Sequence, residues 1–107
     1  MTNNAGATVN AVLYKAADCY LQNSDFGFGA YDAATGAVSC VAPNSAGTGP
    51  GTRIEQLYPL SAGSSYYEAF YSSVWQAVDT GNSLPNTCEQ CANNVDNGAG
   101  ISWPLAI

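Results

Sequence analysis

The residues best suited to chemistry are the two cysteines of Cys88-Glu89-Gln90-Cys91, which have the C-x-x-C spacing of redox enzymes and zinc ribbons. Redox chemistry of the thioredoxin type needs this pair on a helix that follows a strand. Here the pair follows a Pro/Asn turn near the C-terminal end. A tetrahedral zinc site needs a second close pair, but Cys19 and Cys40 stand far apart in the sequence. The pattern therefore favours structural disulfides, and we expect no metal and no other cofactor.

Four cysteines are an even number in a short, weakly charged chain, which is typical of a secreted domain held by disulfides. Three connectivities are open. Two cysteines at i and i+3 of one helical turn face the same way, so Cys88 and Cys91 can both reach inward. We therefore favour Cys19 and Cys40 each pairing with one of them. Such a crosslink closes a loop of about 50–70 residues and contributes about 4 kcal/mol to stability.

Catalysis has little support in the remaining residue types. The chain has no histidine, which excludes Ser-His-Asp and Cys-His machinery. Its eight carboxylates show no spacing that singles out a glycosidase pair, and Glu68 is expected to cap a helix. We therefore expect no enzymatic activity and name no catalytic residue.

The segment Asn93–Trp103 combines an aromatic residue with planar amides and a carboxylate. Neutral sugars are bound by an aromatic ring against their C–H faces and by such polar groups on their hydroxyls. A hydrophilic Gly/Asn turn before a buried tryptophan is the alternative, and the sequence leaves the two open. Two tyrosines near turns are reserve candidates. The glycan-binding candidates are Asn94, Asp96, Asn97 and Trp103, with Tyr58 and Tyr66 in reserve.

The composition of the chain limits which classes of partner it can bind. The 107 residues include 2 basic and 8 acidic side chains, so the formal charge is −6. A phosphate-binding surface cannot be built from two cations, which excludes nucleic acid as a main partner. The same deficit argues against anionic membranes, and no stretch approaches the roughly 18 apolar residues of a membrane span. We expect Met1 to have been added for expression of a mature, secreted sequence whose signal peptide is absent or removed.

Hydrophobic periodicity predicts the elements that must position these residues. Residues 8–22 carry apolar side chains in one helical stripe, and residues 65–80 do so again behind a Ser65-x-x-Glu68 capping box. Between them, residues 26–42 predict a β-hairpin with a turn at Gly36, and residues 53–58 predict a third strand. Residues 93–100 are expected to be a loop. The sequence thus predicts an α+β fold, with a flexible stretch at 1–7 and a single domain at 8–107.

In outline the chain resembles a family of small secreted mushroom proteins, the glycan-binding proteins of the ink-cap type. The shared features are a short acidic chain with few charges, four cysteines, many Asn and Tyr, and a helix–hairpin–helix order. The resemblance implies an αββα sandwich and lectin-type binding of fucosylated glycans that contain N-acetylgalactosamine. It also implies a fungal, defensive setting. Because it rests on this outline, it assigns no binding residue.

The function predicted from the sequence is a secreted lectin that recognises neutral glycans or glycoproteins without catalysis. The alternative is a secreted effector or inhibitor that binds a protein and has a defensive role. Neither interpretation includes nucleic acid, membrane insertion or a metal. A homodimer is left open.

Overall fold

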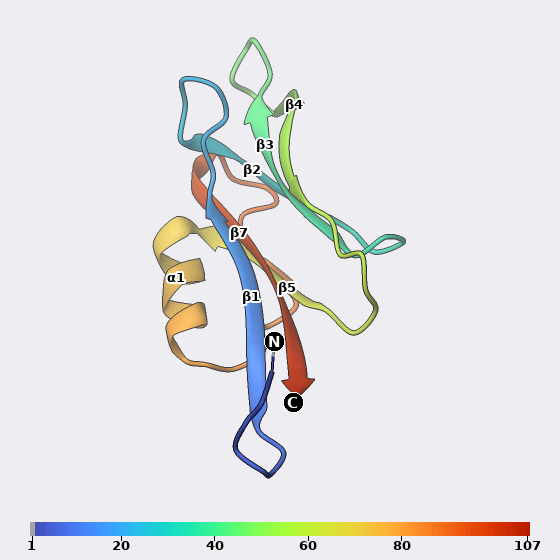
Figure 1. Cartoon of the computed structure of the whole chain (residues 1–107). Coiled ribbons are helices and arrows are strands. Elements are labelled where there is room, and N and C mark those ends of the chain that lie inside the picture. The colour runs from blue at the N-terminus through green and yellow to red at the C-terminus, as the bar shows by residue number, and fades with distance from the viewer. Residues whose placement is uncertain (1) are drawn as a thin grey trace.

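The computed structural model describes residues 2–107 and consists mainly of β-strands (Figure 1). The strands are β1 (Asn10–Asp18), β2 (Phe26–Asp32), β3 (Ala37–Pro43), β4 (Pro50–Leu57), β5 (Ser65–Phe70), β6 (Thr87–Cys88) and β7 (Val95–Ala106), and the helix between β5 and β6 is α1 (Tyr71–Asp79). The predicted α+β sandwich with two long helices is therefore wrong, and so is the αββα order that the resemblance implied. Met1 lies outside the described residues.

The strands form one sheet that folds into two halves. One half has the order β4-β3-β2, and the other places β7 between β1 and β5, with β6 beyond β5. Strand β2 pairs with β7 over only two residue pairs, Phe26 with Asp96 and Gly27 with Val95. This short connection lets one half turn across the face of the other (Figure 1).

The main core lies between the two halves. Buried side chains from β3, among them Val38 and Cys40, meet Ala99 and Ile101 of β7. Cys19 and Leu21, which follow β1, complete this cluster. The core-facing positions of β7 alternate along the strand, as the period of two in a β-strand requires.

The other face of β7 packs against α1. Val74 of the helix and Leu84 form a second buried cluster with Tyr67 and Ala69 of β5. A Cβ atom at Gly98 would lie 2.9 Å from the Cα of Tyr71. The small residues of β7 on this face therefore allow the helix to approach the sheet closely.

The predicted first helix is the strand β1. It pairs with β7 along its whole length, from Asn10 opposite Ala106 to Asp18 opposite Gly98. Its apolar side chains lie on both faces: Tyr14 and Ala16 pack against the cluster that includes α1, and Leu13 lies on the opposite face. A strand with apolar residues on both faces loses its alternation, and those of β1 happened to fall at helical spacing.

The predicted second helix is a strand followed by a shorter helix. Residues 65–70 form β5, and α1 begins only at Tyr71. The capping box is wrong, because Ser65 and Glu68 both lie in β5 and pair with β7. Phe70, one of the apolar residues in the predicted helical stripe at 65–80, is 45% exposed. The predicted end of the helix is confirmed by Gly81, whose φ of 73° suits a residue without a side chain.

The central part of the chain follows the prediction more closely. The hairpin is confirmed as β2 and β3, with Gly36 at a φ of 76° in the turn. The third strand is confirmed as β4, although it begins earlier, at Pro50. Residues 93–100 are not a loop, because β7 begins at Val95 and continues through Trp103.

The structure confirms two disulfides but corrects their pairing. Cys19 is bonded to Cys40, and Cys88 is bonded to Cys91. The predicted pairing assumed a helix over 8–22 and a helical turn at 88–91, and neither is present. Cys19 instead follows β1 beside β3, which carries Cys40, while Cys88 ends β6 and meets Cys91 across a turn. In the described part of the chain, no helix is long and apolar enough to span a membrane.

Candidate functional site

A groove of about 590 Å³ lies where the β1–β7 ribbon meets the loop that joins β4 to β5. The ribbon supplies one wall, with apolar side chains from both strands. The loop supplies the other wall from residues 58–63. The groove is lined by Leu13, Lys15, Ile101, Trp103, Pro104 and Leu105 from the ribbon and by Tyr58, Leu60, Ser61, Ala62 and Gly63 from the loop.

The groove exists because the ribbon is longer than the half-sheet that packs on it. Ile101 is buried in the main core, whereas Trp103 only packs against its edge. Leu13, which pairs with Trp103 across the two strands, is 45% exposed. β1 and β7 extend beyond the strands β2, β3 and β4 (Figure 1). The apolar face of the ribbon therefore continues past its cover and is flanked only by the loop.

Trp103 is held in a fixed orientation at the centre of this site. Its indole Nε1–H donates to the backbone carbonyl of Ser61 at 3.3 Å. This bond ties the ribbon to the loop across the groove, and it satisfies the polar atom of a ring that is otherwise apolar. The remaining ring surface contributes to the groove wall as a preformed aromatic plate.

The loop presents a large apolar side chain to solvent. Leu60 is 92% exposed, and Tyr58 beside it is 51% exposed. Lys15 is also exposed in the groove lining, and it is one of only two basic residues in the chain. The site thus joins an apolar surface to a single positive charge in a protein whose net charge is −6.

Two of the six predicted binding residues meet in the groove. Trp103, proposed as the plate, and Tyr58, held in reserve, both line it. Tyr66, the other reserve residue, lies elsewhere: its ring stacks on that of Tyr31 with centroids 3.6 Å apart, and it packs against the main core. Burial raises the pKa of the Tyr66 phenol, with a smaller contribution from Tyr31.

The predicted polar partners of Trp103 are not in the groove. Asn97 is fully buried within the fold, at the far end of β7. Asp96 lies near Asp18, whose pKa is raised by burial and then by the charge of Asp96. Asn94 is exposed in the turn before β7. The prediction placed these three residues in a loop at 93–100, close to Trp103 in the sequence, but the extended strand separates them from the tryptophan.

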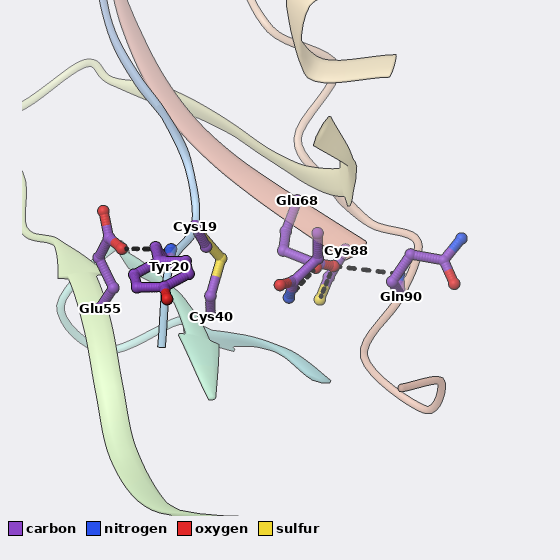
Figure 2. Close-up of a disulfide and its surroundings, with 8 residues drawn as sticks. Cys19, Tyr20, Cys40, Glu55, Glu68, Cys88 and Gln90 are labelled. Atoms are coloured by element: carbon purple, nitrogen blue, oxygen red, sulfur yellow. Dashed lines mark hydrogen bonds between the residues drawn. A yellow bond between two sulfur atoms is a disulfide. The ribbon is translucent and has the colours of Figure 1, made fainter. Parts of the chain in front are cut away.

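A second group of polar residues, outside the groove, surrounds Glu68. Its side chain is fully buried between the two half-sheets. The carboxylate accepts hydrogen bonds from the Asn97 side-chain amide and the Gln90 backbone N–H, both at 3.0 Å. Oε2 also lies 3.4 Å from Sγ of Cys88 (Figure 2). Burial is the main cause that raises the pKa of Glu68 to about 7, while the two hydrogen bonds oppose the rise.

Space for this buried carboxylate comes from β2. A Cβ atom at Gly29 would overlap the carboxyl group of Glu68, so glycine is the residue that fits beneath it. The sulfurs of Cys88 and Cys91 and a Glu68 oxygen all lie within 4.8 Å of one another, which is close enough for metal ligands. Because the two sulfurs are bonded to each other, neither is a thiolate that could bind a metal in this oxidation state.

Sequence signals for both groups were present but ambiguous. Leu60 stands between Pro59 and Ser61 in a turn, and a large apolar residue at such a position is a signal for a binding surface. Glu68 stands among aromatic and apolar residues, which is also a signal for a buried carboxylate once the segment is seen as a strand. The helical interpretation of residues 65–80 hid the second signal.

Neither a scan against protein-family models nor searches of curated proteins and of solved structures found a match to this chain. The resemblance to mushroom glycan-binding proteins therefore stays a prediction.

Proposed function

We propose that this chain is a secreted binding protein that docks an apolar segment of a partner protein in the Trp103 groove. The observation that carries the proposal is the apolar face of the β1–β7 ribbon, which extends past the half-sheet that covers it. Trp103 has a fixed orientation on this face, and the loop beside it exposes Leu60. An exposed apolar surface beside a concave site is typical of protein interaction surfaces.

The composition of the groove supports a protein segment as the occupant. Leu13, Leu60 and Leu105 offer dispersion contacts to an aliphatic or aromatic side chain, and Trp103 offers a rigid ring. Polar side chains are few, with Lys15 and Ser61 the main donors among the lining residues. The fitting ligand is therefore an apolar side chain with a carboxylate beside it that can face Lys15.

Two further features agree with a secreted protein that binds a ligand. The two disulfides are compatible with an oxidising, extracellular compartment. The groove lining is mostly apolar, which suits binding of an apolar side chain.

A glycan is the second candidate, and one observation favours it. Tyr58 and Trp103, which the sequence suggested as stacking residues, both line the groove. Aromatic rings accept the C–H faces of sugars, and the hydroxyls of Tyr58 and Ser61 can bond to sugar hydroxyls. The groove lacks the amide and carboxylate side chains that neutral sugars favour, which places this candidate behind a protein ligand.

The experiment is selection of a random peptide display library on the immobilised protein, with a glycan array run in parallel. We expect enrichment of peptides that carry a large apolar residue next to Asp or Glu. Leu60→Ser should abolish their binding, because Leu60 is 92% exposed and its loss does not disturb the core. Ile54→Ser is the matched control, since Ile54 is 55% exposed on β4 and lies outside the groove lining.

The outcomes separate the two candidates. Enriched peptides that bind the Ile54→Ser variant but not the Leu60→Ser variant support the protein ligand. Specific binding to one glycan class that is lost in Leu60→Ser, without peptide enrichment, supports the glycan. Ligands that bind wild type and Leu60→Ser equally would show that the groove is not the site.

A further inference from the structure

The two disulfides differ sharply in their access to solvent. Cys19 and Cys40 are 1% and 0% exposed within the main core. Cys88 is only half-buried and Cys91 is exposed, so a solvent thiol can reach the second bridge but not the first. Thiol–disulfide exchange requires such access to the sulfur that is attacked.

The turn that carries the exposed bridge is held by hydrogen bonds that do not depend on it. The Gly29 backbone N–H donates to the carbonyl of Gln90 at 2.9 Å, and the Glu89 N–H donates to the carbonyl of Glu68 at 2.8 Å. The Gln90 N–H donates to the Glu68 side chain. Cleavage of the bridge would thus leave Cys88 and Cys91 close together, ready to reoxidise.

The inner sulfur of this bridge lies beside a buried carboxyl. Sγ of Cys88 is 3.4 Å from Oε2 of Glu68 (Figure 2), whereas Cys91 is exposed to solvent. Near the Cys19–Cys40 bridge, the Glu55 carboxylate accepts from the Tyr20 N–H at 3.3 Å, and no carboxyl oxygen is found in contact with either sulfur among the described residues. Only the exposed bridge therefore combines an attackable sulfur with a carboxyl that touches its leaving sulfur.

The groups around Glu68 keep its proton available near neutral pH. From β7 it meets the neutral Asn97 amide, and from β2 only the backbone of Gly29. Glu89, in the turn, is the negative charge that further raises the pKa of Glu68, and Tyr67 binds Glu89 through its hydroxyl. The Cys88–Cys91 pair completes the surroundings and carries no charge while it is oxidised. A carboxyl with a pKa of about 7 can both give and take a proton at physiological pH.

We propose that Cys88–Cys91 is a thiol–disulfide exchange site, in which Glu68 carries the proton to and from the sulfur of Cys88. The co-reactant is an external thiol. Because Glu89 adjoins the site and the net charge is −6, neutral and cationic thiols are favoured over anionic ones.

The reaction balances in two steps. An external thiolate attacks Sγ of Cys91, the sulfur–sulfur bond breaks, and its electron pair passes to Sγ of Cys88, which takes the proton of Glu68. A second external thiolate then attacks the external sulfur of the mixed disulfide and releases Cys91 as a thiolate that solvent protonates. The protein bridge gains two electrons and two protons, and two thiols become one disulfide.

The test is reduction of the folded protein by 2-mercaptoethanol, with alkylation and peptide mass spectrometry to follow each bridge separately. We expect Cys88–Cys91 to open at least about 100-fold faster than Cys19–Cys40, because only the former exposes a sulfur. Oxidised 2-mercaptoethanol should close it again. Cysteamine, a cation, should react faster than glutathione at equal thiolate concentration. Equal opening rates for the two bridges would overturn the proposal.

The role of Glu68 is tested by the pH profile. The rate per thiolate on wild type should fall about 30-fold between pH 6 and pH 8.5, as Glu68, with a pKa of about 7, loses the proton that Cys88 needs. Glu68→Gln should remove this fall. Glu55→Gln is the matched control beside the buried bridge and should keep the wild-type profile.

Two results would contradict this role. One is a wild-type profile that is flat after correction for thiolate, a measurement that needs no variant to fold. The other is a reduced protein that binds one zinc ion per chain and no longer reoxidises, which would make the cluster a metal site.

Discussion

Asn97 and Trp103 project from the same face of β7, six residues apart, into opposite surroundings. Asn97 is fully enclosed and bonded to the Glu68 carboxylate. Trp103 lies at the open end of the same inter-sheet space, among apolar side chains and a single lysine. One end is closed and polar, and the other is open and apolar.

The difference between the two ends follows from where the covering half-sheet, β4-β3-β2, ends. Over Glu68 it supplies Gly29, a residue small enough to let the carboxylate be buried. Past Ile101 it supplies nothing except the loop 58–63, so the apolar face stays accessible. The closed end therefore depends on tight packing for stability, whereas the open end tolerates change and is free to bind.

The largest expected effect is at the closed end. Gly29→Ala should lower the free energy of unfolding by about 3 kcal/mol, because its Cβ would collide with the buried carboxylate. Urea denaturation measures the loss. Gly49→Ala is the control, since the nearest side-chain atom to a Cβ there lies 3.6 Å away. If both variants denature at the same urea concentration, the packing around Glu68 is not as tight as described.

In its burial, Trp103 is intermediate between the closed end and the open end. Because it is only half-buried and packs on the edge of the core, Trp103→Ala should lower the free energy of unfolding by about 2 kcal/mol, below the usual cost of a fully buried aromatic. Thermal denaturation followed by circular dichroism measures this loss. A variant that does not fold would place Trp103 fully in the core and remove the plate from the groove.

The pH dependence of stability reports on the closed end. The pKa of Glu68 in the folded protein is about 7, above its value in the unfolded chain, so the folded state holds the proton more tightly. Stability should therefore fall as pH rises from about 4.5 to about 7 and level off above that, with at most about 3 kcal/mol lost. Glu68→Gln should be more stable than wild type at pH 8 by this amount and match it at pH 4.5. A constant difference between the two proteins across this range would contradict the assignment.

The smallest expected effect on stability is at the open end. Leu60→Ser should change the free energy of unfolding by less than about 0.5 kcal/mol, because the side chain is 92% exposed. Differential scanning calorimetry against wild type measures this difference. A clear loss of stability would mean that Leu60 packs against the fold and is not a free contact for a ligand.

The sequence predicted the elements whose pattern has a single period and a clear turn. Strands β2 and β3 were found because Gly36 marks the turn between them, and β4 because Pro59 marks its end. Strands β1 and β5 were taken for helices because each carries apolar residues on both faces, which removes the alternation that identifies a strand. The disulfide pairing then failed because it was built on those helices.

The candidate site was predicted only in part, for a similar reason. Tyr58 and Trp103 were named for their ring chemistry, which does not depend on the fold, and they do meet. Their expected partners Asp96 and Asn97 were chosen by nearness in the sequence, and an extended strand carries them away from the tryptophan. Leu13 and Lys15 reach the groove only because β1 pairs with β7, which periodicity did not reveal.

The central claim, that the open end is the binding site, is tested most directly by NMR titration of the ¹⁵N-labelled protein with 8-anilinonaphthalene-1-sulfonate. This probe joins aromatic rings to one anionic group, as the groove and Lys15 require. We expect saturable binding with amide shifts confined to residues 13–15, 58–63 and 101–105, and no binding by Leu60→Ser. Shifts centred on residues 66–70 and 88–97, or no saturable binding by wild type, would contradict the account.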